Sequence, residues 1–287
     1  MTLAEYVYTV LLGPRPLKAL ANGVIKSLLP RVVRIGSAEV CLNPADPVIS
    51  GALALRVYEK QEIAIFRSLY QPGMTFVDVG ANVGLYTALA MASGSAGGRI
   101  VCLEPDAESR RFLNQTVERN SKPGGRHVFV LPYAASDSNG SCAFYRNPHN
   151  KGDNRLYADP LLQEHSTVET RTLDSLCEDF GIGSLQLLKI DVQGAEGKVI
   201  AGAARVLQKS KDCIIMTEFW PYGLFRCGFT PRRYLDMLCD LGFVLFSLAR
   251  DGLVPAGDKS ELIAGHPGRR YANLVALKGS YKKYGTR

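Results

Sequence analysis

The sequence contains no long hydrophobic run. No stretch reaches the roughly 18 consecutive apolar residues that a membrane-spanning helix needs, although 46% of the 287 residues are hydrophobic. The nearest candidate, Tyr6–Leu12, stops at Gly13 and Pro14 and has neither a basic segment before it nor a small-residue cleavage site after it. We therefore expect no membrane span and no signal peptide, and a chain long enough to bury a full core.

Paired cysteines are also missing. The seven cysteines are scattered, form no C-x-x-C pair, and in several cases lie within apolar runs. An odd, scattered set without a signal peptide predicts reduced, mostly buried thiols in a cytoplasmic protein. It also argues against a structural zinc site.

The positive net charge of +7 is unevenly placed. Residues 1–35 carry five Lys and Arg against one Glu, and residues 266–287 carry six with no acid, so the segment between them is acidic overall. A nucleic-acid enzyme more often gathers its positive charge around the active cleft, so we expect no nucleic-acid partner. Basic chain ends are usually only exposed to solvent. The more specific interpretation is a weak peripheral contact with anionic lipid.

The sequence has no internal repeat and no low-complexity segment. Apolar runs of strand length alternate with amphipathic stretches of helix length, which is typical of a parallel sheet in a doubly wound α/β fold. Strands are expected at 74–79, 99–103, 127–133, 185–190, 213–219, 243–248 and 271–277, and helices at 83–93, 107–120, 195–208 and 231–241.

We expect two parts, an N-terminal helical and hairpin extension over residues 1–70 and an α/β domain over residues 71–287. Turn signals and periodicity also predict elements outside the regular alternation. These are helical stretches over 3–29, a hairpin over 31–42, a helix over 52–69, and strands over 141–146 and 166–172.

The first strand of the core runs directly into a turn with two glycines. Residues 76–84 read FVDVGANVG, and the next strand ends at Glu104. The spacing of Gly80 and Gly84 is not the G-x-G-x-x-G of a dinucleotide site, and no Gly-Lys-Ser/Thr follows for a phosphate loop. Asp78 would repel a pyrophosphate but attract an ammonium group. S-adenosylmethionine carries an ammonium and a sulfonium and no phosphate, so the turn predicts a site for that cofactor.

Each residue of this predicted site has an expected contact. Asp78 would hold the cofactor ammonium, directly or through water, and Asn82 would bond the amino-acid portion. Gly80 and Gly84 would let the backbone approach the ligand closely. Glu104 can accept both ribose hydroxyls at once, although a carboxylate there could instead complement the start of the next helix.

Further carboxylates follow the later strands. Asp137 could accept from the adenine amino group, or could belong only to the turn before Asn139 and Gly140. Asp191 ends a central strand and is expected to contact the cofactor or the attacking group. Glu196 lies in the first turn of the next helix, and both Asp191 and Glu196 could instead simply complement that helix N-terminus.

The substrate side is expected beyond the fifth strand. Glu218 and Trp220, the only tryptophan, place an acid beside an aromatic face, which suits a sugar or polyol but equally suits ordinary packing of a buried aromatic. The polar loop 147–159 is long enough to form a lid. His149 or His165 is a candidate general base, although a loop histidine is most often only solvated.

At these residues the chain resembles the FkbM family of methyltransferases, over roughly residues 40–250. Many members of that family have glutamate where this chain has Gln193, so an acid role at that position is excluded. The resemblance rests on an ordered series of motifs: FVDVGANVGLYT at 76–87, LEPD at 103–106, AASD at 134–137, TLDSL at 172–176, LLKIDVQGAEGKVIAGA at 187–203 and TEFWP at 217–221.

The resemblance implies a Rossmann-like class I methyltransferase fold with seven strands, the last of them antiparallel. It also implies S-adenosylmethionine-dependent O-methylation of a hydroxyl on a sugar, glycolipid or secondary metabolite. A sugar hydroxyl is a weak nucleophile at neutral pH, so a base should help, and the candidates are Asp191, Glu196, Glu218 and His149. We expect no metal requirement, because no second Asp-Asn pair follows the fifth strand to complete a magnesium site on Asp191.

Three alternatives remain, two of them other enzymes and one a protein without catalytic activity. An N-methyltransferase acting on protein or nucleic acid is opposed by the absence of Asn-Pro-Pro-Tyr and by the acidic middle of the chain. A cofactor-binding module without turnover is opposed by the intact carboxylates and glycines described above. A nicotinamide-dependent dehydrogenase is opposed by the glycine spacing.

Overall fold

A computed structural model of the chain describes residues 29–94, 97–122, 127–148, 150–160, 162, 164–249 and 252–286. The helical stretches expected before residue 29 therefore lie outside the described residues.

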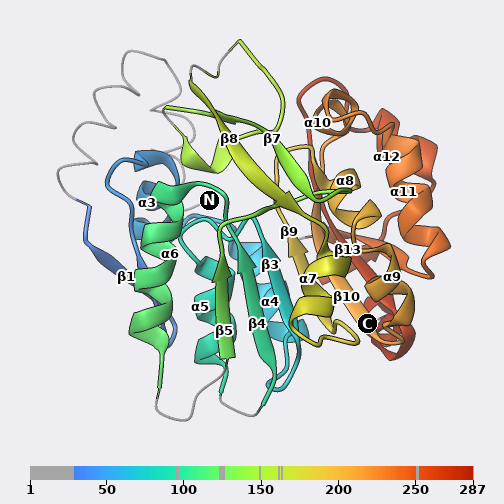
Figure 1. Cartoon of the computed structure of the whole chain (residues 1–287). Helices are drawn as coiled ribbons and strands as arrows, with labels where there is room; N and C mark the ends of the chain where they lie inside the picture. Colours follow the sequence, from blue (N-terminus) through green and yellow to red (C-terminus); the bar gives the residue numbers. More distant parts are fainter. Residues whose placement is uncertain are drawn as a thin grey trace.

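The core is an eight-stranded sheet with the strand order β12-β11-β13-β10-β9-β3-β4-β5 (Figure 1). The five strands from β10 to β5 are parallel, and β13 is antiparallel to both β10 and β11. The strands span Phe76–Val79 (β3), Arg99–Leu103 (β4), His127–Leu131 (β5), Leu187–Ile190 (β9), Cys213–Phe219 (β10), Val244–Ala249 (β11), Gly252–Pro255 (β12) and Ala272–Lys278 (β13).

All seven predicted strands are present, and the antiparallel β13 confirms the expected last strand. The eighth strand, β12, was not predicted. It is four residues long and contains both Gly252 and Pro255, which favour a loop interpretation. It becomes a strand only by pairing antiparallel with β11 at the edge of the sheet.

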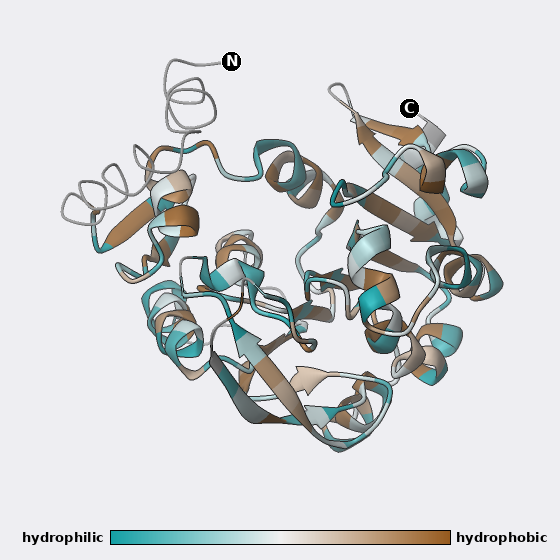
Figure 2. Ribbon diagram, turned by 90° about the horizontal axis from the view of Figure 1, so that it is seen from above, coloured by the Kyte–Doolittle hydropathy of each residue, from teal (hydrophilic) through white to brown (hydrophobic). Residues whose placement is uncertain are grey.

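Helices cover both faces of the sheet, and two hydrophobic clusters form the core (Figures 1 and 2). β3 and β9 are fully buried over their whole length, as a continuous apolar run in a parallel sheet predicts. On one face lie α4 (Lys60–Leu69), α5 (Leu85–Ala92) and α6 (Ala107–Asn120), and on the other α7 (Leu173–Asp179), α8 (Glu196–Ala201), α9 (Ala204–Lys209), α10 (Pro221–Arg226), α11 (Pro231–Asp240) and α12 (Lys259–Ala264).

Two predicted helices are each divided in two. The helix expected over 195–208 breaks between α8 and α9 at Gly202, where a Cβ would lie 2.0 Å from the carbonyl oxygen of Ser136. The helix expected over 52–69 is instead α3 (Pro47–Ala54) followed by α4, and Glu59 between them has a positive φ of 42°. Tertiary packing therefore overrides periodicity at both breaks.

The N-terminal extension packs into the same core as the sheet. The expected hairpin is confirmed as β1 (Val32–Ile35) and β2 (Ala38–Cys41). Val33 and Val40 of the hairpin and Phe66 of α4 belong to one cluster with Phe76 of β3. The domain boundary at residue 70 therefore stays a prediction. The hydrophobic core contains residues from both sides of it.

A small second sheet lies above the main one in Figure 1. It confirms the two additional strands that the sequence predicts around a polar loop. Its strands are β6 (Ala134–Ala135), β7 (Gly140–Arg146) and β8 (Glu164–Arg171).

Two expectations about composition can be compared with the described residues. No helix within them is long and apolar enough to cross a membrane. All seven cysteines fall in the described ranges, and all are free, four of them buried.

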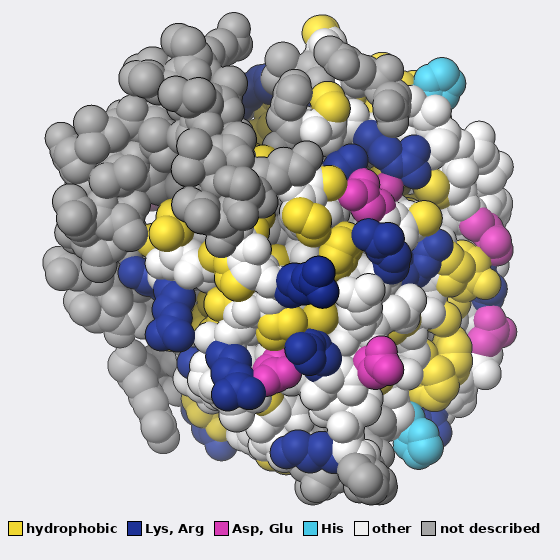
Figure 3. All heavy atoms as spheres, turned by 90° about the vertical axis from the view of Figure 1, so that its left-hand side faces the viewer, with side chains coloured by type: hydrophobic (Ala, Val, Ile, Leu, Met, Phe, Trp, Pro, Cys, Tyr) yellow, Lys and Arg dark blue, Asp and Glu magenta, His cyan; other side chains and the backbone are white. Residues whose placement is uncertain are grey.

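Positive charge gathers on the side of β1, α3 and α6. Figure 3 shows more Lys and Arg than Asp and Glu side chains on that face. Arg34 of β1 and Arg111 and Arg119 of α6 are exposed, and none of the three lines the large cavity described next.

Candidate active site

One cavity of about 890 Å³ opens at the carboxyl ends of the parallel strands. This is the edge where an open α/β sheet places its ligands. The loops after β3, β4 and β9 line it, together with α3, the start of α4 and two further segments, 150–156 and 269–273.

Glu104 lies at the β4 side of this cavity and is 6% exposed. Its Oε2 accepts the Asn82 backbone N–H at 2.8 Å and its Oε1 accepts that of Asp106 at 2.8 Å. Burial raises the pKa of Glu104 to about 7. Each carboxylate oxygen has a second acceptor position, so the pair can still take two hydroxyls.

The turn after β3 places Asn82 at the cavity in a left-handed conformation, with φ of 49°. Its backbone bond to Glu104 ties the two predicted cofactor contacts together. Within the described part of the chain, the side-chain Oδ1 of Asn82 is buried without a hydrogen-bond partner. This acceptor suits a donor supplied by a ligand.

The two glycines of the turn are required by the protein's own packing. Both have positive φ, 78° at Gly80 and 87° at Gly84. A Cβ on Gly80 would lie 2.0 Å from the Asp191 carbonyl oxygen, and one on Gly84 would lie 2.6 Å from Leu113. Gly80 lines the cavity and Gly84 does not, so packing of the turn on β9 and α6 accounts for both without a ligand.

Asp78 is buried at the end of β3 and lines the cavity. Its Oδ2 accepts a hydrogen bond from the Thr87 hydroxyl at 2.7 Å. Burial raises the pKa of Asp78 to about 6, which the bond from Thr87 and the charge of Lys189 only partly oppose. A cation in the cavity would lower this pKa and stabilise the carboxylate.

Lys189 sits among carboxylates at the centre of the sheet. It pairs in register with Asp78, and its Nζ lies 3.4 Å from Asp191 and 4.9 Å from the centre of the Tyr86 ring. Burial alone would lower the pKa of Lys189, but the charges of Asp191, Glu59, Asp78 and Glu218 raise it. The lysine is therefore a fixed cation.

Asp191 and Glu218 face the cavity beside each other. The register of β9 and β10 pairs Ile190 with Thr217, which brings the two following carboxylates into line. The Gln193 amide bonds both, at 3.1 Å to Asp191 and 3.4 Å to Glu218. Burial, Asp191 and Glu196 raise the pKa of Glu218 well above its ordinary value.

Segments from both ends of the described chain complete this side of the cavity. Glu59 accepts a hydrogen bond from the Tyr86 hydroxyl at 2.5 Å. The Asn273 amide of β13 donates to Glu62 of α4 at 2.6 Å. Glu59, Glu62 and Asn273 all line the cavity.

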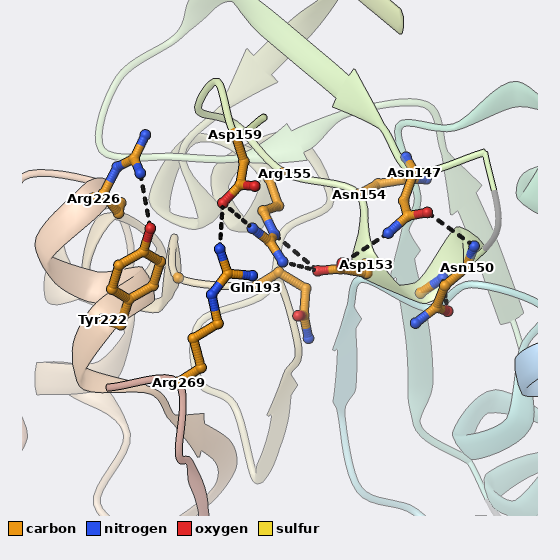
Figure 4. A network of polar contacts seen from close by, with 12 residues as sticks. Asn147, Asn150, Asp153, Asn154, Arg155, Asp159, Gln193, Tyr222, Arg226 and Arg269 are labelled. Atoms are coloured by element: carbon orange, nitrogen blue, oxygen red, sulfur yellow. Dashed lines mark hydrogen bonds and ion pairs between the residues drawn. The ribbon is translucent and has the colours of Figure 1, made fainter. Parts of the chain in front are cut away.

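The polar loop predicted as a lid is held at the cavity by Arg155. Its guanidinium lies between Asp153 and Asp159, at 2.5 Å and 2.8 Å, and Arg269 reaches Asp159 at 3.2 Å (Figure 4). The same guanidinium lies 5.0 Å from the centre of the Trp220 ring, which also lines the cavity. Arg155 and the Asp159 side chain are both buried.

Three other predicted residues lie away from the cavity lining. Glu196 is fully buried, and its Oε1 accepts the backbone N–H groups of Val192 and Gly194 at 3.2 Å, as the helix-start interpretation expects. Asp137 is exposed, and its partner is the Ser136 hydroxyl at 3.1 Å. His165 is exposed on β8. His149 lies outside the described residues.

Sequence reasoning missed several cavity residues. Lys189 could have been recognised from the sequence. A lysine inside the apolar strand LLKI is buried, and a buried lysine needs carboxylate or hydrogen-bond partners. The remaining missed residues come from segments distant in sequence and carried no local signal: Glu59, Glu62, Arg269, Tyr271 and Asn273.

Among the described residues, no three His, Cys, Asp or Glu side chains are placed to bind a metal ion. The expectation about metal dependence stays a prediction.

Comparisons with known proteins find a family model and several curated relatives. The family described as "Methyltransferase FkbM domain" matches residues 78–245. The chain is 30% identical to "2-O-methyltransferase NoeI" of Sinorhizobium fredii, over 59% of this chain and 73% of that protein. It is 26% identical to "Hexuronic acid methyltransferase AglP" of Haloferax volcanii, over 48% of this chain and 53% of that protein.

A solved structure, the FkbM methyltransferase of Methylobacillus flagellatus, matches with a TM-score of 0.45 and 14% identity. The match covers 91% of this chain and 59% of that one, so the chain spans less than two thirds of that protein and of AglP. The family match alone covers more than half of the sequence. The chain therefore belongs to the FkbM methyltransferase family and is an S-adenosylmethionine-dependent methyltransferase.

Proposed function

We propose that the chain is an O-methyltransferase whose acceptor is a hydroxyl of a sugar, a glycolipid or a secondary metabolite. The observation that carries the proposal is the pair Asp191 and Glu218, held side by side at the cavity by Gln193. The names of NoeI and AglP, which describe a 2-O-methyltransferase and a hexuronic acid methyltransferase, support it.

The cofactor site in this proposal lies at the β3 and β4 side of the cavity. Glu104 would accept the ribose hydroxyls through the acceptor positions that its two backbone bonds leave open. Asn82 would accept from the ammonium through its Oδ1, which has no hydrogen-bond partner among the described residues, and Asp78 would stabilise that charge from the end of β3. Asp137, Gly84 and Glu196 are not part of this site, because none of them lines the cavity.

When bound, S-adenosylmethionine supplies a methyl group already activated by its sulfonium. The protein's task is then alignment and proton removal. Glu218 is suited to accept the hydroxyl proton, because burial and the neighbouring carboxylates Asp191 and Glu196 raise its pKa and make it a stronger base than an exposed glutamate. Asp191 would orient the hydroxyl, since Lys189 and Gln193 fix its two oxygens.

The first test is binding by calorimetry. We expect S-adenosylhomocysteine to bind the wild type, and NAD and ATP not to bind. Glu104→Ala should weaken the binding of S-adenosylhomocysteine by about tenfold to a hundredfold, since the substitution removes a charge-assisted contact of roughly 1.5–3 kcal/mol. The matched control is Glu169→Ala on β8, which is exposed and away from the cavity.

The second test is turnover on a panel of hydroxylated acceptors. Asp191→Asn and Glu218→Gln should each lower kcat by more than tenfold, a typical loss for acid–base groups, with S-adenosylhomocysteine affinity nearly unchanged. Cofactor binding without methyl transfer to any acceptor would favour a non-catalytic module. Transfer to amines alone would favour an N-methyltransferase.

A further inference from the structure

One end of the cavity combines the family core with segments outside it. We call this the acceptor end and define it by Glu59, Glu62, Asp191, Glu218 and Asn273. Only Asp191 and Glu218 fall within the family match at residues 78–245. Features of this end can therefore be specific to this chain.

Carboxylates outnumber cations at the acceptor end. Lys189 interacts with Asp78, Asp191, Glu59 and Glu218, and it is the one buried cation that the described residues place among them. Asp191, Glu59 and Glu218 belong to the acceptor end and Asp78 lies beside it, so the acidic groups around Lys189 outnumber this cation. Burial is the main cause of the raised pKa values of Asp78, Glu59 and Glu218, and the charge of Asp191 raises all three further.

The arginines of the cavity do not correct this surplus. Arg155 and Arg269 are paired with Asp153 and Asp159, so their charges are already balanced by two carboxylates. Lys60 lines the cavity from an exposed position at the start of α4, where solvent screens its charge.

Trp220 gives an independent sign of a polar ligand. It lines the cavity and is 5% exposed. Its indole N–H has no hydrogen-bond partner within the described part of the chain. A buried donor without a partner is unfavourable, and an oxygen of a polyol would satisfy it.

We propose that the acceptor is a polyhydroxylated compound with a protonated amino group, such as an amino sugar, and that the acceptor end excludes carboxylates and phosphates. This inference rests on the proposed function and narrows its acceptor. The cofactor brings a net charge of +1, which offsets the surplus only in part. A second cation would be attracted by the remaining carboxylates, and an anion would be repelled.

The amino group would be held, not methylated. An ammonium that donates to carboxylates has no free lone pair, so the reacting atom remains the hydroxyl oxygen. Methylation on nitrogen would therefore contradict the inference.

The test compares three sugars that differ in charge and little else. Methyl glucosaminide, methyl glucoside and methyl glucuronide are titrated into the protein saturated with S-adenosylhomocysteine, and binding is followed by saturation-transfer NMR at pH 7. We expect the amine to bind at least about tenfold more tightly than the neutral sugar, and the uronate not to bind, as unscreened charge contacts predict.

Glu62→Gln tests the origin of the preference. This residue lies outside the proposed chemistry, and its neutral amide should reduce the preference for the amine by about threefold. Glu169→Gln, exposed on β8, should leave the preference unchanged.

The outcomes separate the inference from the proposed function. Equal binding of the three sugars, binding of none, or tightest binding of the glucuronide would overturn the inference, even if the enzyme methylates a neutral hydroxyl compound. Failure to bind S-adenosylhomocysteine would instead overturn the proposed function.

Discussion

At the scale of single residues, carboxylates close in sequence have different surroundings. Glu218 faces the cavity beside Asp191, whereas Glu196 points into a turn and accepts two backbone N–H groups. Burial raises the pKa of both, to about 7 for Glu196 and well above the ordinary value for Glu218. A raised pKa alone therefore does not identify a catalytic group, and access to the cavity separates the two.

Gly80 gives a prediction at the same scale. In Gly80→Ala the new Cβ would meet the Asp191 carbonyl oxygen at 2.0 Å, so the β3 turn or the β9 end must move. Gly181→Ala is the matched control, because Gly181 also has positive φ but no atom within 4 Å of a Cβ. We expect a loss of about 1 kcal/mol in the free energy of unfolding for the control and of more than about 3 kcal/mol for Gly80→Ala.

Chemical denaturation measures both variants. Equal losses would mean that the turn adjusts freely and that Gly80 is needed only for its backbone conformation.

At the scale of elements, the loop before β8 is an integral part of the active-site wall. The sequence predicts a polar lid over 147–159, and segment 150–156 does line the cavity. The backbone of Arg155 exchanges two hydrogen bonds with that of Tyr145 of β7, at 2.8 Å and 2.9 Å, and Arg226 of α10 donates to the Ala158 carbonyl at 2.5 Å. These contacts brace the loop against both the second sheet and α10.

Arg155→Met tests this bracing. It leaves the buried Asp159 carboxylate with Arg269 as its remaining arginine partner. Breaking a buried ion pair typically costs about 3–5 kcal/mol, so we expect a clearly lower Tm, faster proteolysis within the loop and a loss of turnover.

Arg205→Met serves as the control for Arg155→Met. Arg205 is 61% exposed and pairs with Asp174 and Glu178 at the surface. An exposed pair contributes about 0–1 kcal/mol. A Tm for Arg155→Met as high as that of the control would show that the network does not hold the loop.

At the scale of the whole molecule, the buried carboxyl groups link folding to pH and to the cofactor. Burial raises the pKa to about 6 for Asp78 and to about 7 for Glu104 and Glu196. The unfolded chain loses these protons at lower pH than the folded protein does. The stability they contribute is therefore fully present below about pH 4 and lost as pH rises through 6 and 7.

We therefore expect the Tm of the cofactor-free protein to fall between pH 5 and pH 8, and less steeply in Glu104→Gln, whose amide does not titrate. The loss in the free energy of unfolding over this range should be smaller in Glu104→Gln by roughly 3 kcal/mol, at about 1.4 kcal/mol for each pKa unit. Calorimetric unfolding across this range measures it. Parallel pH profiles for the two proteins would contradict the assignment of a raised pKa to Glu104.

Much of the fold follows from local sequence. β10 and β4 have the predicted bounds, and α6 begins after Asp106, which caps it through the Ser109 N–H. The short apolar runs between turn residues become strands of the central sheet, because a parallel sheet covered by helices buries both of its faces. The sequence also predicted Asp78, Asn82, Glu104, Asp191 and Glu218, which all line the cavity, because residues at the carboxyl ends of parallel strands lie at the ligand edge of the sheet.

Only the tertiary structure decided which residues share the cavity. Glu59, Glu62 and Asn273 join Asp191 because α4 and β13 pack beside the ends of β9 and β10. Asp137, which follows β6 of the second sheet, and Glu196, the first residue of α8, do not line the cavity. Local sequence determines an element through its own burial and hydrogen bonds. A cavity is formed by side chains from segments that are distant in sequence and come together only when the chain packs. A local sequence pattern therefore does not identify them.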